Sequence, residues 1–190
     1  MKPAYDIAAS YQENYDRGPS LDPPPEVPGT PHKEFLGFSV SSRFGIAAGL
    51  LLNSKWILGY ARQGYDLLTY KTVRSAAREC YPPPNWVYVD ADESDGPVYV
   101  LDQPPADPNA ISSAVCFGMP SMTPDVWRED IARCKEGLGE GQLLIVSVVA
   151  SPQPGWTSAQ LADDYAQCAA WAAEAGADAV EANLSCPNVC

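Results

Sequence analysis

From Phe44 onward the chain alternates short apolar runs with segments of helical periodicity, and this alternation restricts the fold more than any other feature. Residues 143–149 form an apolar run, which is typical of a strand buried on both faces of a parallel sheet. Strands that alternate with helices form βαβ units, so the pattern predicts an α/β fold. We expect strands over residues 44–49, 66–73, 143–149 and 178–184, and helices over 54–63, 123–138 and 157–175.

The first 34 residues differ from the rest of the chain because they are rich in Tyr, Pro and Asp. A run of three prolines at 23–25 opposes regular structure. We therefore predict a Pro-rich N-terminal extension over 1–34 that covers the domain or is partly disordered, followed by one domain over 35–190. At the start of that domain, Phe35 to Val40 resembles a short strand or hairpin arm.

Residues 85–102 are predicted to form a hairpin inserted into the domain, because Trp86–Val89 and Val98–Leu101 alternate like strands. The turn between them carries Asp90, Asp92, Glu93 and Asp95. It lacks the glutamate that closes a calcium-binding loop, so we expect a solvated hairpin tip and no metal site.

Charge and composition exclude several classes of function. The 190 residues include 24 acidic and 12 basic ones, and a net charge of −12 argues against nucleic-acid partners. No apolar run reaches the roughly 18 residues that span a bilayer, so no membrane partner is expected. None of the six cysteines forms a C-x-x-C pair, and no signal peptide precedes the domain, so we predict reduced thiols and a cytoplasmic location.

The ends of the predicted strands carry residues suited to chemistry, since parallel α/β barrels place their active sites there. Ala47, Ala48 and Gly49 allow a flat ligand to approach closely, or else reflect tight packing. Lys71 at the end of a buried strand needs a partner such as a reduced flavin, or else it points to solvent. Between residues 116 and 121 the sequence is Cys-Phe-Gly-Met-Pro-Ser, in which Gly118 and Pro120 set a turn that exposes backbone groups.

The last of these segments is the most informative. Asn183, Ser185, Cys186 and Asn188 are crowded where a strand ends, since Pro187 stops the ladder. Carboxamides recognise donors and acceptors on planar amides, and a thiolate can remove a proton from carbon. A single buried cysteine is usually inert, but a cysteine between two asparagines at a strand end is difficult to explain by packing.

Together these segments resemble the dihydroorotate dehydrogenase family, including the related catalytic domain of dihydropyrimidine dehydrogenases. Asn-Leu-Ser-Cys-Pro-Asn at 183–188 is the most specific signature, and we expect the resemblance to cover about residues 36–190. It implies an FMN-binding TIM (β/α)8 barrel, of which this chain supplies about the first four βα units as an N-terminal half. It also implies an oxidoreductase of pyrimidine biosynthesis that transfers hydride between a dihydropyrimidine, such as dihydroorotate, and flavin.

The resemblance also implies roles for individual residues. Cys186 is the expected catalytic base, and Lys71 contacts both flavin and substrate. A cysteine at the base position resembles the soluble, cytoplasmic class, and Arg78 matches an arginine of that class. FMN contacts are expected from Ala47, Ala48, Gly49, Lys71, Thr72 and Asn183, and substrate contacts from Lys71, Gly118, Met119, Asn183 and Asn188.

Three features depart from the family pattern. Val115 stands where the family has a substrate-binding asparagine, and Asn85 follows three prolines where the soluble class has Pro-x-Pro-Arg. The later flavin lysine and phosphate-binding loops are absent from these 190 residues, so we expect this chain alone to be inactive and the full-length enzyme to be a homo-oligomer. The alternatives are a different FMN-barrel reductase with another substrate, and an inactive half-barrel fragment.

Overall fold

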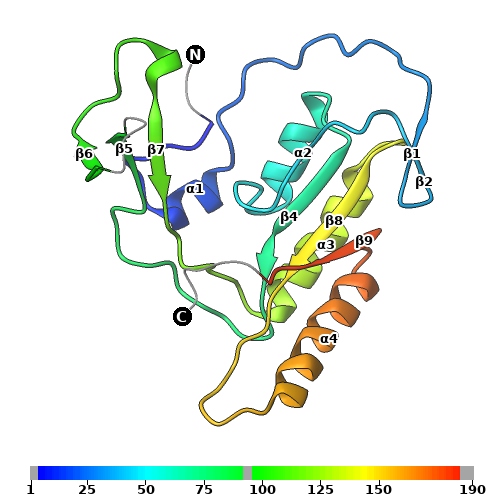
Figure 1. The fold of residues 1–190 in the computed structure, drawn as a ribbon. Helices are drawn as coiled ribbons and strands as arrows, with labels where there is room; N and C mark the ends of the chain where they lie inside the picture. Colours follow the sequence, from blue (N-terminus) through cyan, green and yellow to red (C-terminus); the bar gives the residue numbers. More distant parts are fainter. Residues whose placement is uncertain (1–3, 92–95, 185–190) are drawn as a thin grey trace.

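A four-stranded parallel sheet forms the centre of the computed structural model, which describes residues 4–91 and 96–184 (Figure 1). Each pair of neighbouring strands is joined through a connection that contains a helix, as the alternation of the sequence predicts. The mixed α/β fold with a parallel sheet is therefore confirmed. The strands lie in the order β3 (Gly45–Ile46), β4 (Leu67–Val73), β8 (Leu143–Val148) and β9 (Ala179–Ala182), and the helices are α2 (Ser54–Arg62), α3 (Pro124–Gly137) and α4 (Ser158–Glu174).

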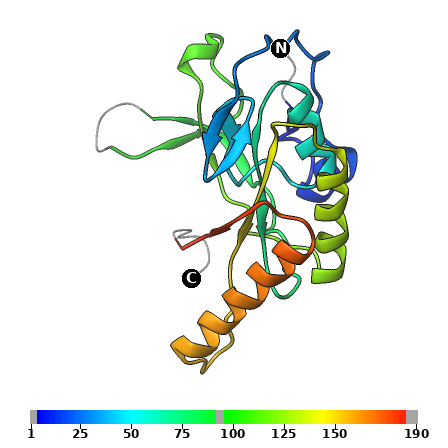
Figure 2. The same ribbon diagram turned by 90° about the vertical axis from the view of Figure 1, so that its right-hand side faces the viewer.

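The main hydrophobic core lies between these helices and one face of the sheet (Figure 2). Alternate residues of each strand point to the same face. Burial of one such large apolar side chain stabilises the fold by about 1.5–3 kcal/mol. The strands contribute Leu68, Tyr70, Leu144, Val146 and Val148, and the helices contribute Trp56, Ile57, Trp127, Ile131, Cys134, Cys168 and Ala172.

A hairpin covers the beginning of the opposite face. It consists of β1 (Lys33–Phe35) and β2 (Phe38–Val40), which pair in antiparallel fashion. Val40 is 1% exposed and packs against Leu67 and Leu143, the first residues of β4 and β8. The hairpin arm predicted near residues 35–40 is thus confirmed, and it closes the amino-terminal end of this face.

The segment between β4 and α3 contains a second, antiparallel sheet. Its central strand β5 (Trp86–Asp90) pairs with β6 (Tyr99–Leu101) on one side and β7 (Ser112–Val115) on the other. A short 3-10 helix, η1 (Pro108–Ala110), precedes β7. The predicted hairpin is confirmed, whereas β7 was not predicted because Ser-Ser-Ala-Val shows little apolar alternation. The acidic residues Asp92 to Asp95 lie outside the described residues.

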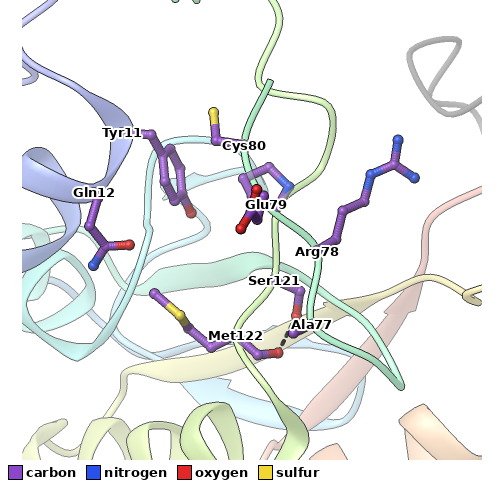
Figure 3. A pocket seen from close by; sticks show the side chains of 9 residues that line it. Tyr11, Gln12, Ala77, Arg78, Glu79, Cys80, Ser121 and Met122 are labelled. Carbon is purple, nitrogen blue, oxygen red and sulfur yellow. Dashed lines mark hydrogen bonds between the residues drawn. The ribbon is translucent and has the colours of Figure 1, made fainter. Parts of the chain in front are cut away.

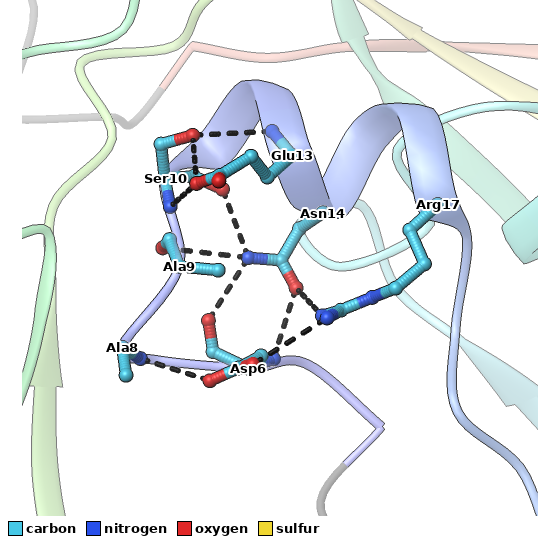
Figure 4. Close-up of polar contacts among 7 residues, drawn as sticks. All are labelled: Asp6, Ala8, Ala9, Ser10, Glu13, Asn14 and Arg17. Atoms are coloured by element: carbon cyan, nitrogen blue, oxygen red, sulfur yellow. Dashed lines mark hydrogen bonds and ion pairs between the residues drawn. The ribbon is translucent and has the colours of Figure 1, made fainter.

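The prediction that no regular structure precedes residue 35 was wrong, because α1 (Tyr11–Arg17) forms there (Figure 4). Ser10 and Glu13 make a capping box, in which the Ser10 side chain accepts from the Glu13 amide at 3.2 Å. This signature stands well before the proline-rich run. The expectation that the segment covers the domain is correct, since Tyr5 and Tyr11 belong to the main core.

Asn14 ties this segment together from a fully buried position (Figure 4). Its Nδ2 donates to the carbonyls of Asp6 and Ser10, each at 2.9 Å. Its Oδ1 accepts from the Asp6 amide and from an Arg17 Nη2, also at 2.9 Å. One carboxamide therefore satisfies backbone groups before the helix and within its first turn. Within the described ranges, no helix is long and apolar enough to cross a membrane.

Replacing Asn14 with Ala should lower the free energy of unfolding by about 2 kcal/mol or more, because several hydrogen bonds of a fully buried carboxamide are lost together. Chemical denaturation of the two proteins measures this difference. Asp16→Ala, an exposed change on the same helix, should alter stability by no more than about 0.5 kcal/mol. Equal effects of the two substitutions would contradict this role of Asn14.

Candidate functional site at the carboxyl edge of the parallel sheet

The sequence-predicted site residues that the structure describes lie at or near one edge of the parallel sheet. Ala47, Ala48 and Gly49 follow β3, Lys71 and Thr72 lie at the end of β4, and Asn183 follows β9. The carboxyl ends of parallel strands meet at this edge, where α/β enzymes bind their ligands. Cys186 and Asn188 lie outside the described residues.

A β-bulge shapes the end of β4. Tyr70 pairs with Val146 and Val73 pairs with Val148, so two residues of β4, Lys71 and Thr72, stand opposite one residue of β8. That residue is Ser147. A bulge redirects side chains and is common beside active sites. Strict alternation therefore fails here, and Lys71 and Thr72 are both buried at the same point of the sheet.

Polar side chains from three strand ends make a connected cluster at the bulge. Thr72 Oγ1 and Ser147 Oγ share a buried hydrogen bond of 2.9 Å. Asn183 Nδ2 donates to Thr72 Oγ1 at 3.1 Å and lies 3.6 Å from Met119 Sδ. The structure thus brings together three of the predicted residues, Thr72, Met119 and Asn183. Ser147 was missed, although a hydroxyl inside an otherwise apolar buried strand was its signal.

Asn183 is held by its backbone as well as by its side chain. Its amide donates to the Val148 carbonyl at 2.9 Å. Its own carbonyl accepts from the Tyr165 hydroxyl of α4 at 2.8 Å. These two bonds fix the backbone of Asn183 relative to β8 and α4.

Lys71 is buried, with 5% of its surface exposed. The alternative that it points to solvent is therefore wrong. Its Nζ lies 5.9 Å from the centroid of the Tyr11 ring, within the range of a cation–π interaction. A buried ammonium is costly unless its surroundings stabilise the charge. The structure thus places the Lys71 side chain over an aromatic ring near the polar cluster.

Arg74 is a second buried cation, and the sequence analysis missed it. Only 2% of its surface is exposed. Its Nε donates to the Met119 carbonyl at 3.1 Å, and its Nη1 donates to the Ala150 carbonyl at 2.8 Å. It therefore joins the loop after β7 to the end of β8. The sequence analysis singled out Lys71 because a buried cation needs a partner. The same argument applies to Arg74.

The predicted turn at Gly118 and Met119 depends on left-handed backbone. Gly118 has φ of +74° and Met119 has φ of +50°. A Cβ on Gly118 would lie 2.8 Å from the Tyr81 ring, so glycine is required here for space as well as for conformation. The turn directs the Met119 side chain toward Asn183.

A pocket of about 570 Å³ opens beside this region (Figure 3). In Figure 3 the side chains of Tyr11, Glu79 and Met122 converge, whereas the Arg78 guanidinium points away from them. That guanidinium donates to the Tyr81 hydroxyl at 3.1 Å. The pocket is lined by Tyr11, Gln12, Ala77, Arg78, Glu79, Cys80, Pro120, Ser121 and Met122, so the N-terminal helix contributes to its wall.

The structure describes two residues that depart from the family pattern, Val115 and Asn85. Val115, at the end of β7, is 49% exposed and presents no hydrogen-bonding side chain. Asn85 Nδ2 donates to the Tyr81 carbonyl at 2.9 Å and to the Cys116 carbonyl at 3.3 Å. Asn85 therefore braces its own loop against the residue after β7.

Two described cysteines are poor candidates for acid–base chemistry. Burial and the neighbouring Asp164 raise the pKa of Cys168 to about 12. Burial also raises the pKa of Cys134, which is fully enclosed in the core. The thiolate is the reactive form, so these side chains are inert near neutral pH. Within residues 4–91 and 96–184, no group of three or more side chains could hold a metal ion.

At pH 8, Cys134 and Cys168 should be alkylated at least about 100-fold more slowly in the native protein than in urea. The raised pKa lowers the fraction of thiolate at any pH below it, and burial blocks access. Iodoacetamide labelling followed by mass spectrometry measures both rates. Native labelling of Cys168 as fast as in urea would contradict this assignment.

No protein-family model matches this chain. Among curated proteins, the dihydroorotate dehydrogenase of Dictyostelium discoideum is 34% identical over 203 aligned residues, which cover 99% of this chain and 54% of the relative. The chain thus spans about half the length of the curated relative it matches. The match includes the N-terminal segment, so the expectation that the resemblance begins near residue 36 was wrong. The chain is therefore similar to about half of a dihydroorotate dehydrogenase, in agreement with the resemblance of its motifs to that family.

Proposed function

We propose that this chain is the N-terminal half of an FMN-dependent dihydroorotate dehydrogenase with a (β/α)8 barrel. The observation that carries the proposal is the cluster of Thr72, Ser147 and Asn183 beside the buried Lys71. The cluster lies at the carboxyl edge of four parallel strands, where such barrels place their chemistry. Similarity to the curated relative supports the same assignment at the family level.

The residues at this edge fit a flavin. Ala47 and Ala48 carry only methyl groups, and no atom lies within 4 Å of a Cβ added to Gly49. The backbone after β3 thus faces open space that a planar ring can approach. Lys71 supplies positive charge, which suits a ring that becomes negatively charged on reduction. We propose that Ala47, Ala48, Gly49, Lys71, Thr72 and Asn183 hold the flavin.

The chemistry of the reaction is divided between protein and cofactor. Bound FMN supplies the acceptor for the hydride that leaves C6 of the dihydropyrimidine. Cys186 removes the proton from C5, so that a double bond remains between C5 and C6. Asn183 and Asn188 orient the ring through its amide groups, and Lys71 and the Gly118–Met119 turn complete the substrate site.

A second candidate is an FMN-barrel reductase that acts on a different reduced ring. The exposed Val115 favours it, since valine provides no hydrogen bond at a position where the family has asparagine. A site that hydrogen-bonds an amide rejects ligands that leave its polar groups unpaired. Replacement of one substrate-binding asparagine by valine can therefore change substrate preference strongly.

Anaerobic addition of dihydroorotate to the protein made from the whole coding sequence should bleach its flavin absorbance, because hydride transfer reduces the isoalloxazine. A visible spectrum recorded before and after addition measures this change. A flavin band that stays unchanged, but bleaches with another dihydropyrimidine, supports the second candidate. Absence of any flavin from the purified protein would rule out both.

Cys186→Ala should slow reduction of the flavin by dihydroorotate by about 100-fold or more, since general-base catalysis is lost. Bound flavin should remain stoichiometric, because the proposed flavin contacts are unchanged. Cys190→Ala removes a thiol four residues away and serves as the control, with an expected rate near that of the unmodified protein. Stopped-flow absorbance gives the rates. Unchanged reduction in Cys186→Ala would exclude Cys186 as the base.

A further inference from the structure

The N-terminal helix α1 is docked rigidly beside the candidate site. Its core-facing residues Tyr11, Asn14 and Tyr15 are spaced i, i+3 and i+4 and therefore share one face. The Asn14 carbonyl accepts from the Trp56 indole at 3.2 Å. The Tyr15 carbonyl accepts from Asn53 Nδ2 at 2.7 Å. Side chains of α2 and of its N-cap thus hold the backbone of α1, which defines where the Tyr11 ring lies.

Tyr11 contacts both Lys71 and the residue before the Gly118 turn. Its ring centroid lies 5.9 Å from Lys71 Nζ and 5.4 Å from the centroid of Phe117. The side chain is 8% exposed, so the contact with the ammonium is largely shielded from water. Tyr11 also lines the 570 Å³ pocket, and it lines a narrow cavity together with Lys71. A ligand in this pocket meets the ring that packs on Lys71.

We propose that Tyr11 is a positioning residue for Lys71, so that the N-terminal helix is part of the active site. Its catalytic significance rests on the function proposed above. An aromatic face attracts an ammonium through its quadrupole and brings no negative charge of its own. Burial raises the pKa of Tyr11 well above its usual value, so the ring stays neutral. Tyr11 thereby orients Lys71 and adds no negative charge of its own beside the ammonium.

Lysine NMR tests the contact without any substrate. Substitution of Lys71 identifies its [13Cε]lysine resonance in the spectrum of the protein made from the whole coding sequence. A lysine over an aromatic face is shifted upfield by the ring current. We expect the Lys71 signal to lie upfield of the others and to show a nuclear Overhauser effect to the Tyr11 ring. Tyr11→Phe should retain the upfield shift, and Tyr11→Leu should abolish it.

Tyr5→Leu is the matched control. Tyr5 is buried on the same segment and also packs on Phe117, at 5.6 Å between ring centroids. Its loss should reduce stability but leave the Lys71 shift in place. A Lys71 signal at the same position in the unmodified protein and in Tyr11→Leu would overturn the proposal. If Tyr11→Leu does not fold, absence of the Overhauser effect in the unmodified protein would overturn it equally.

Flavin reduction tests the catalytic meaning separately. Under saturating dihydroorotate, the flavin of the Tyr11→Leu variant should be reduced about tenfold more slowly than the flavin of the Tyr11→Phe variant. Equal rates in these two variants would show that Tyr11 does not position Lys71 for the reaction. If dihydroorotate fails to reduce even the unmodified protein, the proposed function fails, whereas the NMR result still decides whether Tyr11 holds Lys71.

Discussion

The candidate site depends on the bulge at which β4 leaves its register with β8. A regular ladder would place Lys71 and Thr72 on opposite faces of the sheet. Because both stand opposite Ser147, the buried ammonium and the hydroxyl cluster occupy the same point of the carboxyl edge. Thr72 then bonds to Ser147 and accepts from Asn183, which connects β4, β8 and the end of β9. One irregularity in strand pairing thus brings chemistry from three strands together.

The N-terminal segment stabilises that arrangement from the side. Buried Asn14 organises its own backbone, and its carbonyl accepts from Trp56 of α2. Tyr5 adds aromatic contacts to Trp56 and Trp86 at centroid distances of 6.0 and 5.3 Å. The segment therefore joins the helical layer to the antiparallel sheet. Its inclusion in the alignment with the Dictyostelium relative agrees with a structural role that extends beyond this chain.

Periodicity predicted the parallel sheet well because β4 and β8 are buried and β8 is almost wholly apolar. It failed in three places where other forces decide. Helix α1 depends on the Ser10–Glu13 capping box, a short-range signal that precedes the proline-rich run. β7 depends on pairing with β5, which only the fold brings about. Ser147 and Arg74 carried weaker signals, a hydroxyl and a cation near buried strands, and neither belongs to a family motif quoted for this chain. Individual site residues were predictable from strand ends, but the bulge that joins them was not.

The two buried cations at this edge have different surroundings and therefore different roles. Arg74 donates to the carbonyls of Met119 and Ala150, so its planar guanidinium links two segments of backbone. Lys71 instead lies over an aromatic ring, which attracts the ammonium without a formal negative charge. Exchange of the two residue types would not be conservative, because a lysine at 74 would lose the forked geometry that spans two carbonyls. In an acidic chain of net charge −12, these two cations are buried and do not lie at the surface. If the site binds flavin as proposed, positive charge at this edge would favour a ligand that carries or develops negative charge there.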